Sequence, residues 1–103
     1  MQYLKRYVEA EIEFKMGVAG VVVVLGPKFC GKTTTAKLFA HSLFSLDEKE
    51  KIEMAQSDPH MVLSGETPRL VDEWQMAPNL WNVARSEVDS RNDKFGQYIF
   101  TGS

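Results

Sequence analysis

The segment from Val21 to Phe39 constrains the fold of this chain more than any other, because three patterns follow one another in it directly. It opens with a run of apolar β-formers, VVVVL, in which polar and apolar positions do not alternate. Strands of that kind are buried on both faces by flanking helices, and they belong to parallel sheets. A loop between Gly26 and Gly31 follows, and then a helical pattern begins. The segment therefore predicts a strand, a tight loop and a helix in an α/β domain.

The loop matches a phosphate-binding pattern, G-x-x-x-x-G-K-[ST], at every fixed position with the sequence GPKFCGKT. Its glycines let the backbone turn so that N–H groups point inward, and the start of the next helix adds partial positive charge. Lys32 is expected to reach the terminal phosphates of a nucleotide, and the Thr33 hydroxyl to bind Mg²⁺. The predicted nucleotide-binding residues are Gly26, Pro27, Lys28, Phe29, Cys30, Gly31, Lys32, Thr33 and Thr34.

Apolar periodicity and turn signals predict the other elements. Helical spacing indicates helices over residues 4–15, 32–44, 47–56 and 80–91, with one or two further turns over 58–65. Short strands are indicated over 42–46, 69–74 and 98–101. Trp74 and Trp81 are expected to pack in the core rather than to stack on a base. Because strands and helices alternate, the chain is expected to form a layered α/β domain without an internal linker.

Polar residues follow two of the predicted strands. Asp72 and Glu73 end the strand that begins at Arg69, roughly forty residues after the loop. At the carboxyl end of a parallel strand, both acids reach the crevice in which open α/β sheets bind ligands. We expect Asp72 to hold Mg²⁺ through a water molecule and Glu73 to orient and deprotonate an attacking water. Thr101 and Ser103 end the last strand, where a hydroxyl would touch the γ-phosphate or that water; a plain turn is the alternative.

Composition and charge narrow the class of protein. The formal net charge is −2, which argues against a dedicated nucleic-acid binder. A single cysteine excludes an internal disulfide, and two distant histidines give no zinc-site spacing. The N-terminal sequence lacks the apolar core of a signal peptide, and the longest apolar run is far shorter than a membrane span. We therefore expect a cytoplasmic protein with no membrane partner, whose metal is the Mg²⁺ that arrives with the nucleotide.

The phosphate loop, the Asp72–Glu73 pair and the strand with a polar end resemble the core of the AAA+ ATPases. The segments LKRY, GPKFCGKTTTAK, GETPRLVDEWQMAPNLW and DKFGQYIFTGS resemble, more narrowly, a prokaryotic subgroup in which an AAA-type domain precedes a C-terminal domain of obscure function. The resemblance implies ATP as ligand and a P-loop three-layer α-β-α sandwich with parallel sheet order 1-4-3-2 and a fifth strand beside the first. It also implies Glu73 as the catalytic glutamate and Thr101 or Ser103 as the residue that senses the γ-phosphate. With Lys32 of the phosphate loop, the predicted catalytic residues are Lys32, Glu73, Thr101 and Ser103.

The sequence departs from the subgroup at its end. Members of the subgroup continue well beyond the Thr-Gly-Ser turn at 101–103, whereas this chain stops there. The fifth strand, the helical lid and an arginine finger would be missing, and Arg69, Arg85 and Arg91 are not placed to substitute. We therefore expect residues 1–103 to be the N-terminal part of a single AAA-type P-loop ATPase domain, with its first strand as an open sheet edge.

Three functions fit these residues. The first is Mg-dependent ATP hydrolysis coupled to work on an unknown protein partner; the isolated chain would be weakly active or inactive, because an arginine finger contributes about 10³–10⁵ in kcat. The second is a small P-loop kinase, which needs an acceptor pocket and a lid, although Glu73 beside Asp72 favours water as acceptor. The third is a nucleotide-binding switch without turnover. The absence of an Asn-Lys-x-Asp motif favours ATP over GTP, and the sequence leaves homo-oligomerisation open.

Overall fold

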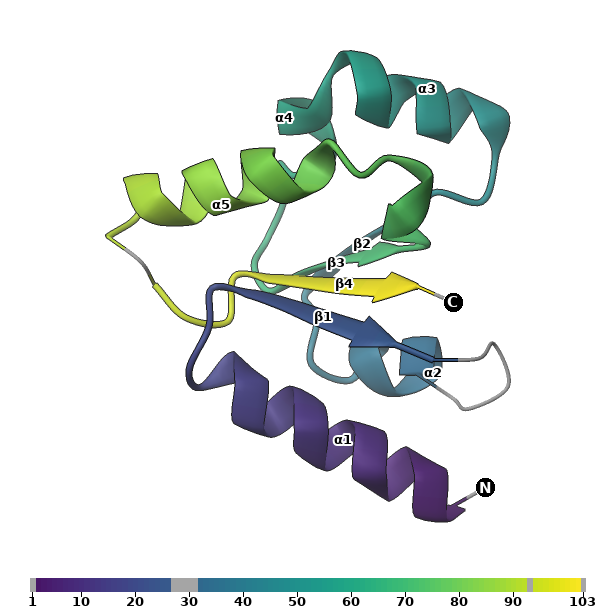
Figure 1. The fold of residues 1–103 in the computed structure, drawn as a ribbon, viewed down its shortest axis with the longest axis vertical. Coiled ribbons are helices and arrows are strands. Elements are labelled where there is room, and N and C mark those ends of the chain that lie inside the picture. The colour runs from purple at the N-terminus through teal and green to yellow at the C-terminus, as the bar shows by residue number, and fades with distance from the viewer. Residues whose placement is uncertain (1, 27–31, 93, 103) are drawn as a thin grey trace.

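Residues 2–26, 32–92 and 94–102 are described by the computed structural model of the chain. Helices and strands alternate along them, as predicted (Figure 1). In chain order the elements are α1 (Gln2–Met16), β1 (Val21–Leu25), α2 (Lys32–Lys37), β2 (Ser42–Ser45), α3 (Lys49–Ser57), α4 (Pro59–Val62), β3 (Arg69–Asp72), the 3₁₀ turn η2 (Trp74–Met76), α5 (Leu80–Ser90) and β4 (Tyr98–Gly102). Among the helices of these residues, none combines the length and the apolar character that a membrane span requires.

The strands form one parallel sheet in the order β1-β4-β3-β2, which confirms the order that the resemblance implied. Thr101 of β4 lies opposite Val24 of β1 on one side and opposite Asp72 of β3 on the other. All five residues of β4 are buried. Within the described residues, β1 has a strand neighbour on one side only. The carboxyl ends of the strands therefore meet at one edge of the sheet, with β4 at its centre.

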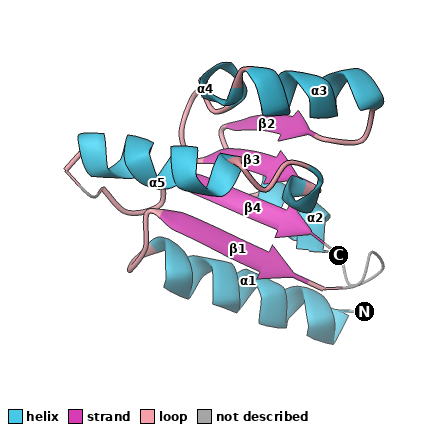
Figure 2. Ribbon diagram, turned by 45° about the horizontal axis from the view of Figure 1, so that its top comes forward, coloured by secondary structure: helices cyan, strands magenta, loops and turns pink. Residues whose placement is uncertain are grey.

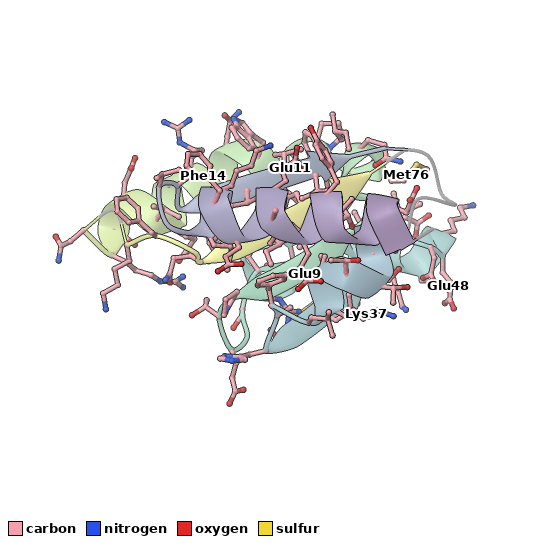
Figure 3. The ribbon with its side chains drawn as sticks, turned by 90° about the horizontal axis from the view of Figure 1, so that it is seen from below. Glu9, Glu11, Phe14, Lys37, Glu48 and Met76 are labelled. Atoms are coloured by element: carbon pink, nitrogen blue, oxygen red, sulfur yellow. The ribbon has the colours of Figure 1, made fainter. Side chains whose placement is uncertain are left out.

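Helices cover both faces of the sheet, so the predicted three-layer arrangement is confirmed (Figure 2). α1 and α2 lie on one face, where Ile12 and Ala36 pack with Val22 of β1. Seen from that side, α1 crosses the sheet beside α2 (Figure 3). The opposite face carries α3, α4 and α5, and there Leu80 packs with Val71 of β3. The burial of apolar side chains on both faces is the main force that holds the strand ends in place.

The helix after the loop is shorter than the apolar pattern predicted. It ends at Lys37 rather than at 44, and i→i−3 hydrogen bonds close its last turn. The run of β-branched threonines at 33–35 lowers its helix propensity. The His41 N–H then donates to the Pro68 carbonyl at 2.8 Å, which draws the chain alongside β3 to begin β2. Leu38, which follows the last helical residue, is consequently 65% exposed.

Trp74 and Trp81 pack against the core beside the sheet, as predicted. The Trp74 ring stacks on Phe100 with 5.6 Å between ring centroids, and Trp81 lies 6.2 Å from Trp74. At the opposite end of the strands, the Arg69 Nε donates to the Val62 carbonyl at 2.5 Å. Burial lowers the pKa of that Arg69 guanidinium. The aromatic packing stiffens the edge that carries Asp72, whereas Arg69 stabilises the edge farthest from it.

Candidate active site

Three side chains from three elements meet at the carboxyl edge of the sheet. Asp72 is the last residue of β3, and Thr101 lies beside it on β4. The Thr101 Oγ1 donates to the Asp72 Oδ1 at 2.6 Å, and the Thr33 Oγ1 of α2 donates to the same oxygen at 2.9 Å. Thr101 is fully buried, whereas Thr33 and Asp72 are partly exposed. The carboxylate is therefore oriented by two hydroxyl groups, one of them anchored within the sheet.

Glu73 adopts a backbone conformation that residues other than glycine rarely adopt. Its φ of 58° and ψ of 41° lie in the left-handed region, which costs a non-glycine residue roughly 1–2 kcal/mol. This turn ends β3 at Asp72 and starts η2, so the strand is shorter than the predicted 69–74. The Gln75 Nε2 donates to the Glu73 Oε2 at 2.8 Å. Because such backbone strain concentrates at functional sites, it supports a functional role for Glu73 independently of the sequence motif.

The predicted phosphate loop is described only at its two ends. The Gly26 N–H donates to the Gly102 carbonyl at 3.2 Å, which joins the start of the loop to the end of β4. Lys32 is the first residue of α2, with its side chain outside the described atoms, and Thr34 is exposed on the same helix. The other predicted site residues lie outside the described residues, and their roles stay predictions: Pro27, Lys28, Phe29, Cys30, Gly31 and Ser103.

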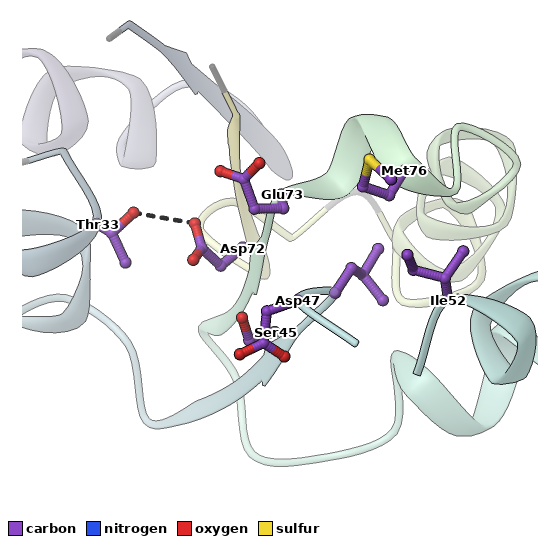
Figure 4. A pocket seen from close by; sticks show the side chains of 8 residues that line it. Thr33, Ser45, Asp47, Ile52, Asp72, Glu73 and Met76 are labelled. Atoms are coloured by element: carbon purple, nitrogen blue, oxygen red, sulfur yellow. Dashed lines mark hydrogen bonds between the residues drawn. The ribbon is translucent and has the colours of Figure 1, made fainter. Parts of the chain in front are cut away.

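A cavity of about 520 Å³ opens beside the two acids (Figure 4). In this view the carboxyl groups of Asp72 and Glu73 are both turned toward Thr33. The volume of the cavity falls within the range of small-molecule binding sites. Polar groups line one part of the cavity and apolar groups the other, and the described residues that line it are Thr33, Ser45, Leu46, Asp47, Ile52, Asp72, Glu73 and Met76.

The donor set at the end of β3 suits Mg²⁺ more than a softer metal. A hydroxyl and a carboxylate are hard oxygen donors, and Mg²⁺ in nucleotide sites takes only one or two protein groups together with phosphate oxygens. The Thr33 hydroxyl and the Asp72 carboxylate are already within hydrogen-bond distance of each other. Over the residues that the structure describes, no group of three or more His, Cys, Asp or Glu side chains could form a metal cage of its own. The residues present therefore fit a cation that is shared with a bound phosphate.

Sequence reasoning missed two residues of this site, Gln75 and Gly102. A Cβ atom at position 102 would lie 2.4 Å from the Gln75 Oε1, so glycine there leaves room for the amide to cross the end of β4. The segment Asp-Glu-Trp-Gln contains no glycine, proline or asparagine that would signal a turn. Only the left-handed turn at Glu73 brings the Gln75 amide back to its carboxylate.

Replacing Thr101 with valine is expected to lower the free energy of unfolding by roughly 1–3 kcal/mol. The valine keeps the shape of the threonine, but the buried donor to the Asp72 carboxylate is lost. Urea titration followed by far-UV circular dichroism measures the change. Thr34→Val, at an exposed position of α2, is the matched control and should stay within about 0.5 kcal/mol of the parent chain. Equal stabilities of Thr101→Val and the parent would contradict a structural role for this hydrogen bond.

The sequence was compared with known proteins and families. A family model described as an AAA domain matches residues 18–103, a span that contains the phosphate loop, both acids and Thr101. Searches of curated proteins and of solved structures gave no significant match. The family match covers most of the chain and agrees with the sheet order seen in the structure. This chain belongs to the family of AAA domains.

Proposed function

We propose that this chain binds Mg-ATP and that the intact protein hydrolyses it to ADP and phosphate. An AAA domain is a nucleotide-binding domain of the ATPase type. The observation that carries the proposal is the convergence of the Thr33 and Thr101 hydroxyls on one oxygen of Asp72. It supports a phosphate-and-magnesium site because Thr33 is the last residue of a phosphate-loop sequence.

The proposed binding roles follow from the chemistry of each group. Backbone N–H groups late in the loop and at the start of α2, together with the Lys32 ammonium, would bind the phosphates. Thr33 and Asp72 hold Mg²⁺, which neutralises charge on the phosphate oxygens when it is bound. Thr101 orients Asp72 by its hydrogen bond. In this proposal, Thr101 or Ser103 also contacts the γ-phosphate or the attacking water.

In the proposed hydrolysis step, Glu73 acts as the general base. Its carboxylate accepts a proton from a water molecule while the water oxygen forms a bond to the γ-phosphorus. The bond between that phosphorus and the bridging oxygen to the β-phosphate breaks, and ADP leaves. A positioned base of this kind contributes about 10²–10⁴ in rate. The partial burial of Glu73 beside Asp72 and the cavity supports this role.

We also propose that residues 1–103 are the N-terminal part of a single AAA-type P-loop ATPase domain, which works in the cytoplasm on a protein partner. None of the three arginines whose side chains are described lines the cavity, so in this proposal an arginine finger would come from elsewhere. Arg69 contacts Val62, Arg85 lies over the Trp81 ring at 5.9 Å, and Arg91 donates to the Tyr98 hydroxyl at 2.9 Å. Because an arginine finger contributes about 10³–10⁵ in kcat, the chain alone should bind nucleotide better than it hydrolyses it.

Phosphoryl transfer to a small acceptor is the second candidate function, and the cavity is the observation that favours it. A kinase needs an acceptor pocket beside the γ-phosphate. The cavity of about 520 Å³ next to Thr33 and Asp72 has room for a small acceptor molecule. The Ser45 and Asp47 side chains would supply polar contacts to such an acceptor. We rank this function below hydrolysis because Glu73, beside Asp72, is a base that would deprotonate a water molecule.

Calorimetric titration of the chain with Mg-ATP and with Mg-GTP, together with a phosphate-release assay, tests these proposals. We expect ATP to bind more tightly than GTP and phosphate to appear slowly without any added acceptor. Release only after an acceptor is added, together with a phosphorylated product, would favour the kinase. A chain that is folded by circular dichroism yet binds neither nucleotide would contradict the proposed function.

A further inference from the structure

We propose that Gln75 is a positioning residue for Glu73. Its side-chain amide holds one oxygen of the Glu73 carboxylate and thereby directs the other oxygen toward the attacking water. The inference rests on the proposed hydrolysis and adds to it a residue that acts through the base rather than on the nucleotide.

The contact between the two side chains is short and involves a charge. The Gln75 Nε2 donates to the Glu73 Oε2 at 2.8 Å. A hydrogen bond to an ionised carboxylate is roughly twice as strong as one between neutral groups. A carboxylate has two oxygens with about four acceptor sites, so a bond to one oxygen restricts the rotation of the group without using all of its acceptor capacity. Fixing the direction of a base in this way is a large part of general-base catalysis.

Packing and a hydrogen bond anchor the backbone between the two residues, and the contact itself lies at the exposed surface. Trp74 lies between them in sequence, and its ring stacks on Phe100 of β4. The Met76 N–H donates to the Glu73 carbonyl at 3.1 Å, which closes the turn. The left-handed backbone of Glu73 is a strained conformation, and it is this turn that brings the two side chains together. Because strained backbone clusters at functional sites, its occurrence at the predicted base supports a functional role for the contact.

The Gln75 amide also lies against the junction between β4 and the phosphate loop. A Cβ atom added at position 102 would lie only 2.4 Å from the Gln75 Oε1. The Gly102 carbonyl in turn accepts the N–H of Gly26, the first residue of the loop. One amide therefore separates the base from the backbone that begins the phosphate loop.

The first test removes the amide and keeps its shape. Gln75→Met is expected to slow ATP cleavage on the order of tenfold or more, measured in a single turnover with protein in excess. The affinity for Mg-ATP should stay within about twofold, because Gln75 does not contact the phosphates in this scheme. Gln56→Met, at an exposed position of α3, is the matched control. An unchanged cleavage rate in Gln75→Met would overturn the inference.

A double variant tests whether Gln75 acts through Glu73. The residual rate of Glu73→Gln/Gln75→Met should equal that of Glu73→Gln alone, because without the base there is nothing left to position. A further loss in the double variant would assign Gln75 an independent role and overturn the inference.

Gly102→Ala tests the same contact without changing Gln75. The new methyl group would occupy the space of the Oε1 and displace the flexible amide. It should slow cleavage in the parent chain and have no further effect in a Gln75→Ala background. Gly17→Ala, where the nearest atom would be 3.5 Å away, is the steric control. Equal slowing of the parent and of Gln75→Ala would overturn the inference.

A readout independent of hydrolysis separates this inference from the proposed function. In the nucleotide-free chain, the ¹⁵N-¹H resonances of the Gln75 side-chain amide should shift on Glu73→Gln and stay in place on Glu53→Gln. Unshifted resonances would overturn the inference even if the chain hydrolyses ATP. Shifted resonances, together with an intact protein that binds Mg-ATP but does not cleave it, would support the contact but overturn both the proposed hydrolysis and the positioning role within it.

Discussion

Replacing Glu73 with glutamine is expected to lower the rate of ATP hydrolysis by about 10²–10⁴ and to leave the affinity for Mg-ATP nearly unchanged. The glutamine has the size of the glutamate, and its carbonyl oxygen can still accept the Gln75 hydrogen bond. It cannot take a proton from water, so only the step that needs a base is affected. Phosphate release in a single turnover measures the rate, on the chain itself or on the intact protein if the chain is too slow.

Two controls make the Glu73→Gln result interpretable. Glu53→Gln on the exposed side of α3 changes the net charge by the same amount at a distance from the cavity, and it should hydrolyse ATP as the parent does. Urea titration should give both variants the stability of the parent, because glutamine and glutamate bear the same left-handed backbone at position 73. Turnover at the parent rate in Glu73→Gln would contradict the assignment of Glu73 as the base.

The layered α/β fold could be predicted because the sequence patterns that indicate its strands and helices are local. The apolar run at 21–25 and the loop beside it required a strand and a helix, and the acids at 72–73 marked where another strand ends. The order of the strands is different, because no local pattern says that β4 lies between β1 and β3. That order was implied by the resemblance alone, and the structure confirms it.

The site was only partly predictable, because its remaining parts depend on contacts between distant segments. Thr33, Asp72 and Thr101 were each expected at the edge of the sheet, but their shared carboxylate oxygen follows from the strand register. Gln75 could not be placed, because the left-handed turn at Glu73 has no signal in the sequence. The early end of α2 likewise depends on pairing across the sheet, which outweighs the apolar pattern after Lys37.

Replacing Lys32 with alanine is expected to weaken Mg-ATP binding on the order of a hundredfold or more. The lysine is the invariant cation of the phosphate-loop pattern, and it begins α2 directly before Thr33. Removing one member of a charged, hydrogen-bonded pair costs several kcal/mol, because the phosphate charge stays in the site without its partner. Calorimetric titration measures the loss, and circular dichroism establishes that the variant is folded.

Lys37→Ala is the matched control, because it removes the same charge from the last turn of the same helix (Figure 3). Lys37 is exposed, and at physiological salt the field of an exposed charge is screened over about 8 Å. Its loss should therefore change the affinity by less than about twofold. Equal losses in the two variants would indicate a general attraction between the chain and the nucleotide. Parent affinity in Lys32→Ala would contradict binding by the loop, because none of the described lysine side chains lines the cavity beside Thr33 and Asp72.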